Sequence, residues 1–252
     1  MADVSKVVAD RIAITRTLTS ALDVHGTELA TALEKALFPN GAPSDCDVRV
    51  FLAALRAHAE RSVDDVSSKD QAHAVEMADD AGPRQAREDA RTALRESIIG
   101  IRTTLEGIYG AAILNAYGLT GETPIGADEL VHAASTTEDL LRNRPLTEQP
   151  LRIGVSVNMT AIADDLKLRI ETLRAALGDV RREEREAQMT REARNAALLA
   201  WNTSYQGIAN IATGLFELAG HAALAERVRP TARRRAGLTE LADTEGAGGE
   251  GT

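Results

Sequence analysis

Residues 94 to 119 read LRESIIGIRTTLEGIYGAAILNAYGL, the clearest periodic pattern in the chain. Its seam positions alternate between steps of four and three residues, which is the heptad spacing of a helix that packs along a neighbour at a shallow angle. The seam consists of Leu94, Ile98, Ile101, Leu105, Ile108, Ala112, Asn115 and Leu119. We therefore predict one long helix that begins near Pro83 and ends near Leu119.

Weaker patterns predict further helices on both sides of this one. They cover residues 3–37, 46–81 and 127–142, a segment from residue 156, and a last segment around residues 201–218. Between the last two, residues 179–195 are so rich in charge that we expect a solvated helix tip there. Aromatic residues make up only 3% of the chain and β-branched runs are rare. The sequence thus predicts an all-α fold, an elongated antiparallel bundle of about six helices, of which about four are long.

Two stretches of the chain resemble each other. Residues 103–121 read TTLEGIYGAAILNAYGLTG, and residues 203–220 read TSYQGIANIATGLFELAG. Each follows a helix, a break and a long helix, although aligning them requires a one-residue gap inside a helix. The similarity predicts a tandem duplication of a three-helix unit, with residues 1–121 as the first half, 122–230 as the second half packed with the first, and 231–252 as a disordered tail.

Glycines recur inside the predicted helices, where each costs about 1 kcal/mol relative to Ala. Gly100 and Gly107 share a helix face, as do Gly207 and Gly214, because each pair is seven residues apart. A face without side chains lets another helix or a ligand approach closely. We expect close helix packing at these four glycines, with a ligand site as the alternative.

Aromatic residues and asparagines gather in the same two stretches. An apolar pocket with a few amides and hydroxyls is typical of a small-molecule site. The candidate ligand-binding residues are Tyr109, Asn115, Tyr117, Trp201, Asn202 and Tyr205. The alternative interpretation is that the rings fill the core opposite the glycines.

Motifs for catalysis and for metal binding are missing from the sequence. We find no phosphate-binding loop, nucleophile elbow or Ser, His, Asp set, and therefore no catalytic residue. Glu129 and His132 form one Glu-x-x-His pair on a short helix, whereas a di-iron bundle needs such pairs on facing helices. We expect no metal and no cofactor, and the sequence favours a non-enzymatic role without excluding an enzyme.

A cluster of arginines follows the last predicted helix. Arg229, Arg233, Arg234 and Arg235 could contact an anion or an acidic partner. The alternative is that they complement the dipole at the end of that helix.

Charge and composition narrow the possible partners. The formal net charge of −9 does not favour nucleic acid or anionic lipid, and the single cysteine, Cys46, excludes an intramolecular disulfide. The first residues, MADVSKVVADRIAITRTL, lack the apolar core of a signal peptide, so we expect a cytoplasmic protein without a membrane segment. We expect a helical scaffold or adaptor that associates with itself or docks another protein. The alternative is a small-molecule-binding bundle.

Overall fold

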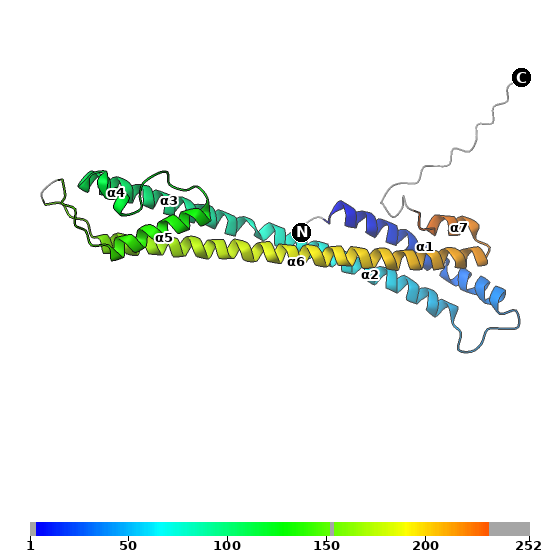
Figure 1. Ribbon diagram of the computed structural model, residues 1–252. Coiled ribbons are helices and arrows are strands. Elements are labelled where there is room, and N and C mark those ends of the chain that lie inside the picture. The colour runs from blue at the N-terminus through cyan, green and yellow to red at the C-terminus, as the bar shows by residue number, and fades with distance from the viewer. Residues whose placement is uncertain (1–3, 152–153, 232–252) are drawn as a thin grey trace, which may run out of the picture. The chain divides into compact units, whose positions relative to one another are not determined.

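The computed structural model describes residues 4–151 and 154–231, and these residues form helices and loops without a strand. This confirms the predicted all-α class. The helices, in chain order (Figure 1), are α1 (Lys6–Leu37), α2 (Val48–Asp79), α3 (Ala81–Tyr109), α4 (Ala112–Ala116), α5 (Ala127–Asn143), α6 (Met159–Leu218) and α7 (Ala222–Val228).

The chain divides into two compact units, which we describe separately. The first unit comprises residues 1–75 and 188–252, and the second comprises residues 76–187. The boundaries therefore cross α2 and α6, and they differ from the predicted halves at 1–121 and 122–230. The tandem duplication stays a prediction. The predicted disordered tail, 231–252, lies outside the described residues except for Thr231.

The core of the first unit is built from α1, α2, the second part of α6, and α7. This core almost completely buries Leu18 and Leu29 of α1 and Val66 of α2. From α6, Trp201 stacks on Tyr205 with 5.0 Å between ring centroids. The Trp201 Nε1–H also donates a hydrogen bond of 2.9 Å to the buried Thr15 Oγ1 of α1, which satisfies the indole within the core.

Asp70 connects two helices of the first unit. Its carboxylate accepts hydrogen bonds from the backbone N–H of Ser5 at 2.8 Å and from the Ser5 hydroxyl at 2.9 Å. Ser5 immediately precedes α1, where backbone N–H groups have no partner within the helix. Asp70, which is 4% exposed, thus satisfies the start of α1 from the side of α2.

The core of the second unit contains the first half of the predicted heptad seam. Leu94, Ile98, Ile101 and Leu105 are buried as their spacing implies, and α5 and the first part of α6 add Leu130, Leu166 and Leu173.

The predicted helix to Leu119 is wrong beyond Tyr109. α3 ends at Tyr109, because the next residue, Gly110, has a φ of +84° that breaks the helix, and the short helix α4 follows. The buried positions after Leu105 therefore differ from the predicted seam. The structure buries Tyr109, Ile113 and Tyr117, whereas the seam predicted burial of Ile108, Ala112 and Asn115; Ala112 and Asn115 are exposed.

The helix tip predicted at residues 179–195 is also wrong. α6 continues through this charged run without a break. Neighbouring turns are joined by polar contacts, including Arg182 to Asp179 at 3.2 Å and Gln188 to Glu192 at 2.9 Å. The run contains neither Pro nor Gly after residue 178, so nothing in its backbone stops a helix.

Candidate functional site

The structure does not bring the six predicted ligand-binding residues together. Tyr109 and Tyr117 are buried in the core of the second unit, and Trp201 and Tyr205 are buried in the core of the first. Asn115 is exposed, and Asn202 is half-buried. The rings therefore fill two separate cores, which agrees with the alternative interpretation given for them.

Tyr117 nevertheless has an unusual environment. Its hydroxyl is shielded from solvent and has no hydrogen-bond partner among the described residues, and the same holds for Arg144 Nη1. The Arg144 guanidinium lies 5.1 Å from the centre of the Tyr117 ring and donates a hydrogen bond of 2.9 Å to Glu148. Burial raises the pKa of the Tyr117 phenol, while the nearby Arg144 charge acts in the opposite direction.

The predicted close packing at the glycines is wrong within the described part of the chain. Gly100, Gly107 and Gly207 are exposed and Gly214 is half-buried. A Cβ atom added at any of the four would have no atom within 4 Å, apart from those of its own helix turn. The physical reason is that the large apolar residues of each helix face the core, and these glycines lie on another face.

One group of acidic side chains among the described residues is close enough to hold a cation. Carboxylate oxygens of Glu76, Glu183 and Glu186 lie within 4.8 Å of one another. The Oε1 atom of Glu76 is shielded from solvent and has no hydrogen-bond partner among the described residues. Burial, followed by the charges of Glu186 and Glu183, raises the pKa of Glu76. The arrangement therefore suits either a proton or an oxygen-binding cation.

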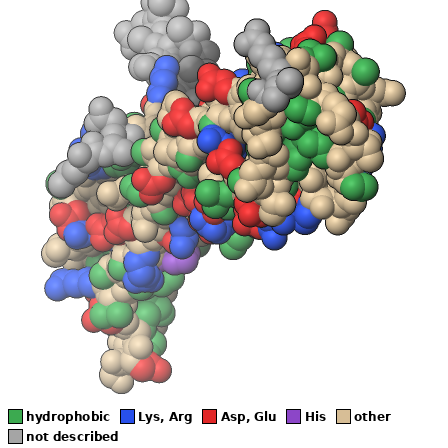
Figure 2. Space-filling view, turned by 90° about the vertical axis from the view of Figure 1, so that its left-hand side faces the viewer, with side chains coloured by type: hydrophobic (Ala, Val, Ile, Leu, Met, Phe, Trp, Pro, Cys, Tyr) green, Lys and Arg blue, Asp and Glu red, His purple; other side chains and the backbone are tan. Residues whose placement is uncertain are grey.

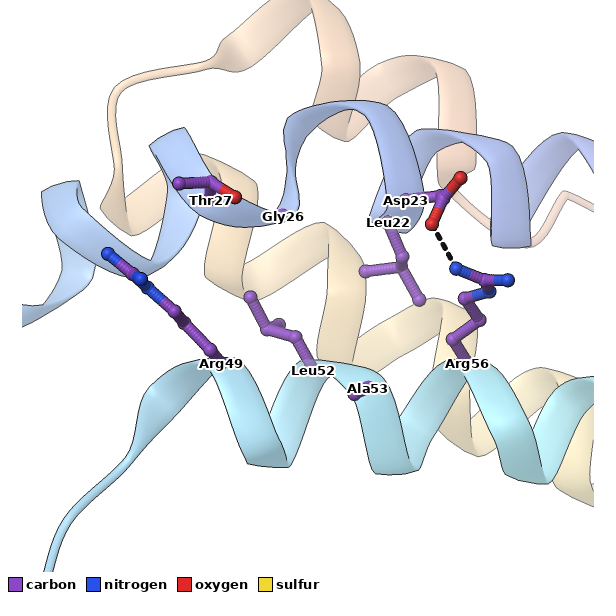
Figure 3. A pocket seen from close by; sticks show the side chains of 8 residues that line it. All are labelled: Leu22, Asp23, Gly26, Thr27, Arg49, Leu52, Ala53 and Arg56. Carbon is purple, nitrogen blue, oxygen red and sulfur yellow. Dashed lines mark hydrogen bonds and ion pairs between the residues drawn. The ribbon is translucent and has the colours of Figure 1, made fainter.

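Two hollows of the first unit border α1. The smaller, about 160 Å³, lies between α1 and α2, where Arg56 pairs with Asp23 and Arg49 extends from α2 toward α1 (Figure 3). It is smaller than the usual range for a drug-sized ligand, roughly 300–1,000 Å³. The larger, about 420 Å³, lies between α1 and α7 and is lined by Arg16, His25 and Arg227 among others.

The predicted arginine cluster is only partly described. Arg229 forms ion pairs with Glu217 at 3.1 Å and with Glu226 at 3.3 Å. Arg233, Arg234 and Arg235 lie outside the described residues. Arg229 therefore connects α6 with the end of α7.

The most extensive unusual surface is a row of small and apolar side chains on α6, which we call the α6 stripe. Residues 195–216 of α6 contain no charged side chain, although much of this segment faces solvent. Met189 is 68% exposed, Ile211 42% and Leu218 61%. Helical spacing places eight residues on one side: Met189, Ala193, Ala196, Ala200, Gly207, Ile211, Gly214 and Leu218. All are exposed except Gly214, which is half-buried.

The α6 stripe differs from an ordinary charged surface. On the face shown in Figure 2, acidic and basic side chains are interspersed with hydrophobic ones. Sequence reasoning missed the stripe because helical spacing alone does not show which apolar face of a helix is buried. The signal that could have revealed it is the uncharged run 195–216 in a chain with 27% charged residues.

Comparisons with known proteins gave no relative. No family model, curated protein or solved structure matches this chain. Within the described residues, no helix is both long enough and apolar enough to cross a membrane.

Proposed function

We propose that this protein is a non-enzymatic helical scaffold that docks a partner helix on the α6 stripe. The observation that carries the proposal is the combination of large exposed apolar side chains at Met189, Ile211 and Leu218 with small residues between them, of which the alanines and Gly207 are exposed and Gly214 is half-buried. Large exposed apolar patches mark protein–protein interaction sites. Small residues between them allow two helix backbones to approach closely.

Packing within the chain gives further support. The residues of α6 that bury themselves in the first unit, such as Trp201, Ile208 and Phe216, lie on a different face from the stripe. The apolar residues of the stripe are therefore not needed for the core of their own unit. A second, separate apolar face on one helix is typical of a helix that contacts two neighbours.

Site-specific photo-crosslinking on the full chain tests this proposal. A photoreactive amino acid at Ala200, in the middle of the stripe, is expected to crosslink efficiently to a polypeptide in the cells that produce the protein. The control position is Asn195, which is exposed on the same helix but off the stripe. Crosslinking at Ala200 no greater than at Asn195 would contradict the proposal.

A further inference from the structure

The hollow between α1 and α7 differs in charge from the chain as a whole. Its volume of about 420 Å³ lies within the usual range of roughly 300–1,000 Å³ for a small-molecule site. The three ionisable residues that line it are all basic: Arg16 and His25 of α1, and Arg227 of α7. The whole chain, in contrast, has 38 acidic and 29 basic side chains. We propose that this hollow binds a small organic molecule that carries a phosphate group.

The hollow also has an apolar side, which suits the organic part of such a ligand. Both helices belong to the first unit. Leu224 of α7 is half-buried and packs against the core of this unit, and Val24 of α1 lines the hollow with it. The other α1 residues here include Ala13, Ser20 and Ala21, whose short side chains leave room beside α7. Apolar surface next to a few polar groups is the usual composition of a small-molecule site.

Arg16 is the basic group on which the proposal depends most. Its side chain has no ion pair or hydrogen bond among the described residues, whereas Arg56 pairs with Asp23 and Arg229 with Glu217. Arg16 lies inside α1, away from both ends, so the helix dipole does not account for a cation there. A guanidinium group can donate two parallel hydrogen bonds to a phosphate. Arg16 is therefore available to bind the anion.

Further donors line the same hollow. Arg227 lies three residues after Leu224, on the same face of α7. The Ser20 hydroxyl has no hydrogen-bond partner among the described residues, so it can rotate to donate to an anion. His25 lies 4.0 Å from Glu28, a carboxylate outside the hollow, and is therefore expected to contribute less than the two arginines.

The exposure of these groups sets the expected strength of binding. Because Arg16 and Arg227 are exposed, dissolved salt screens their attraction for an anion. We expect a dissociation constant of about 0.1–1 mM that rises with ionic strength. The hollow is formed by α1 and α7 and not by the α6 stripe, so this inference does not rest on the proposed function.

A titration of the full chain with phenyl phosphate, followed by the NMR shifts of the backbone amides, tests the inference. Phenyl phosphate supplies one phosphate group and one apolar ring. We expect saturable shifts at residues 13–25 of α1 and 224–227 of α7. Phenol lacks the phosphate and inorganic phosphate lacks the ring, so each should bind at least about fivefold more weakly.

Two arginine variants locate the phosphate. Arg16→Gln is expected to weaken the binding of phenyl phosphate about tenfold, because it removes a charged donor. Arg61→Gln removes the same charge from an exposed position of α2 outside the hollow, and should leave the dissociation constant within about twofold. Circular dichroism checks that both variants stay folded.

Several results would overturn the inference. One is the absence of saturable shifts at these residues of α1 and α7. Another is equal weakening in Arg16→Gln and Arg61→Gln, which would show that the anion is attracted by overall charge only. A third is binding of phenol or of inorganic phosphate as tight as that of phenyl phosphate, because the hollow would then not recognise both parts of the ligand.

Discussion

At the scale of single residues, the environment of each glycine decides whether it can be replaced. Gly107 lies within α3, where a Cβ atom would meet no neighbour within 4 Å. Gly110, three residues later, has a φ of +84°, in the left-handed region that costs a residue with a side chain roughly 1–2 kcal/mol. Two nearby glycines thus have opposite roles: one lowers the helical propensity of α3, and the other ends it.

We predict that Gly107→Ala raises the free energy of unfolding by about 0.5–1 kcal/mol, because alanine favours the helix and there is room for its methyl group. Gly110→Ala, the matched control, should lower it by a similar or larger amount, because the backbone there stays left-handed. Urea unfolding followed by circular dichroism measures both. A loss of stability in Gly107→Ala would show that a neighbour does pack on this glycine.

At the scale of helices, the contact between the end of α2 and α6 contains more acidic groups than basic ones. Glu76 lies with Glu183 and Glu186, and the charges of Asp79 and Asp80 also raise its pKa. Asp80 is itself paired with Arg84 at 2.7 Å. Since a carboxyl group whose pKa is raised in the folded state binds its proton more tightly there, folding is favoured by acid at this position.

We therefore predict that the contribution of Glu76 to stability is lost as the pH rises from its ordinary pKa of 4.5 through the raised value in the folded protein. Glu76→Gln should remove this part of the pH dependence, because the amide does not ionise. Glu184→Gln, at an exposed position of α6 next to Glu183, is the control. The measurement is the midpoint of urea unfolding between about pH 4 and pH 8. An unchanged pH profile in Glu76→Gln would contradict the prediction.

At the scale of the whole molecule, the described residues form two hydrophobic cores, one in each unit. The only tryptophan, Trp201, lies in the core of the first unit. Its fluorescence therefore reports on that unit, whereas circular dichroism reports on the helices of both. These two signals allow the stability of the two cores to be followed in one experiment.

We predict that Leu166→Ala, in the second core, lowers the stability of that unit by about 2–5 kcal/mol and leaves the Trp201 fluorescence transition nearly unchanged. Leu18→Ala, in the first core, should shift the fluorescence transition by a similar amount. Both leucines are at most 1% exposed, so the two substitutions are comparable. Equal shifts of the fluorescence transition in both variants would mean that the cores unfold together.

The sequence determined the fold class and much of the burial, because both depend on local periodicity. The steps from Leu94 to Leu105 predict a buried helix face, and the structure buries these residues. The low aromatic content and the rarity of β-branched runs argued against a sheet. These features could be predicted because a helix face is decided within a few turns of the chain.

The tertiary structure alone decided which parts of the chain meet. Thr15 accepts a hydrogen bond from Trp201 across 186 positions of sequence, and Ser5 is held by Asp70 across 65. Whether a glycine face is packed or open, as at Gly207, depends on where neighbouring helices lie. Helical spacing makes apolar positions on either face of α6 look alike in sequence, and only the packing of the first unit separates its buried residues from the open α6 stripe.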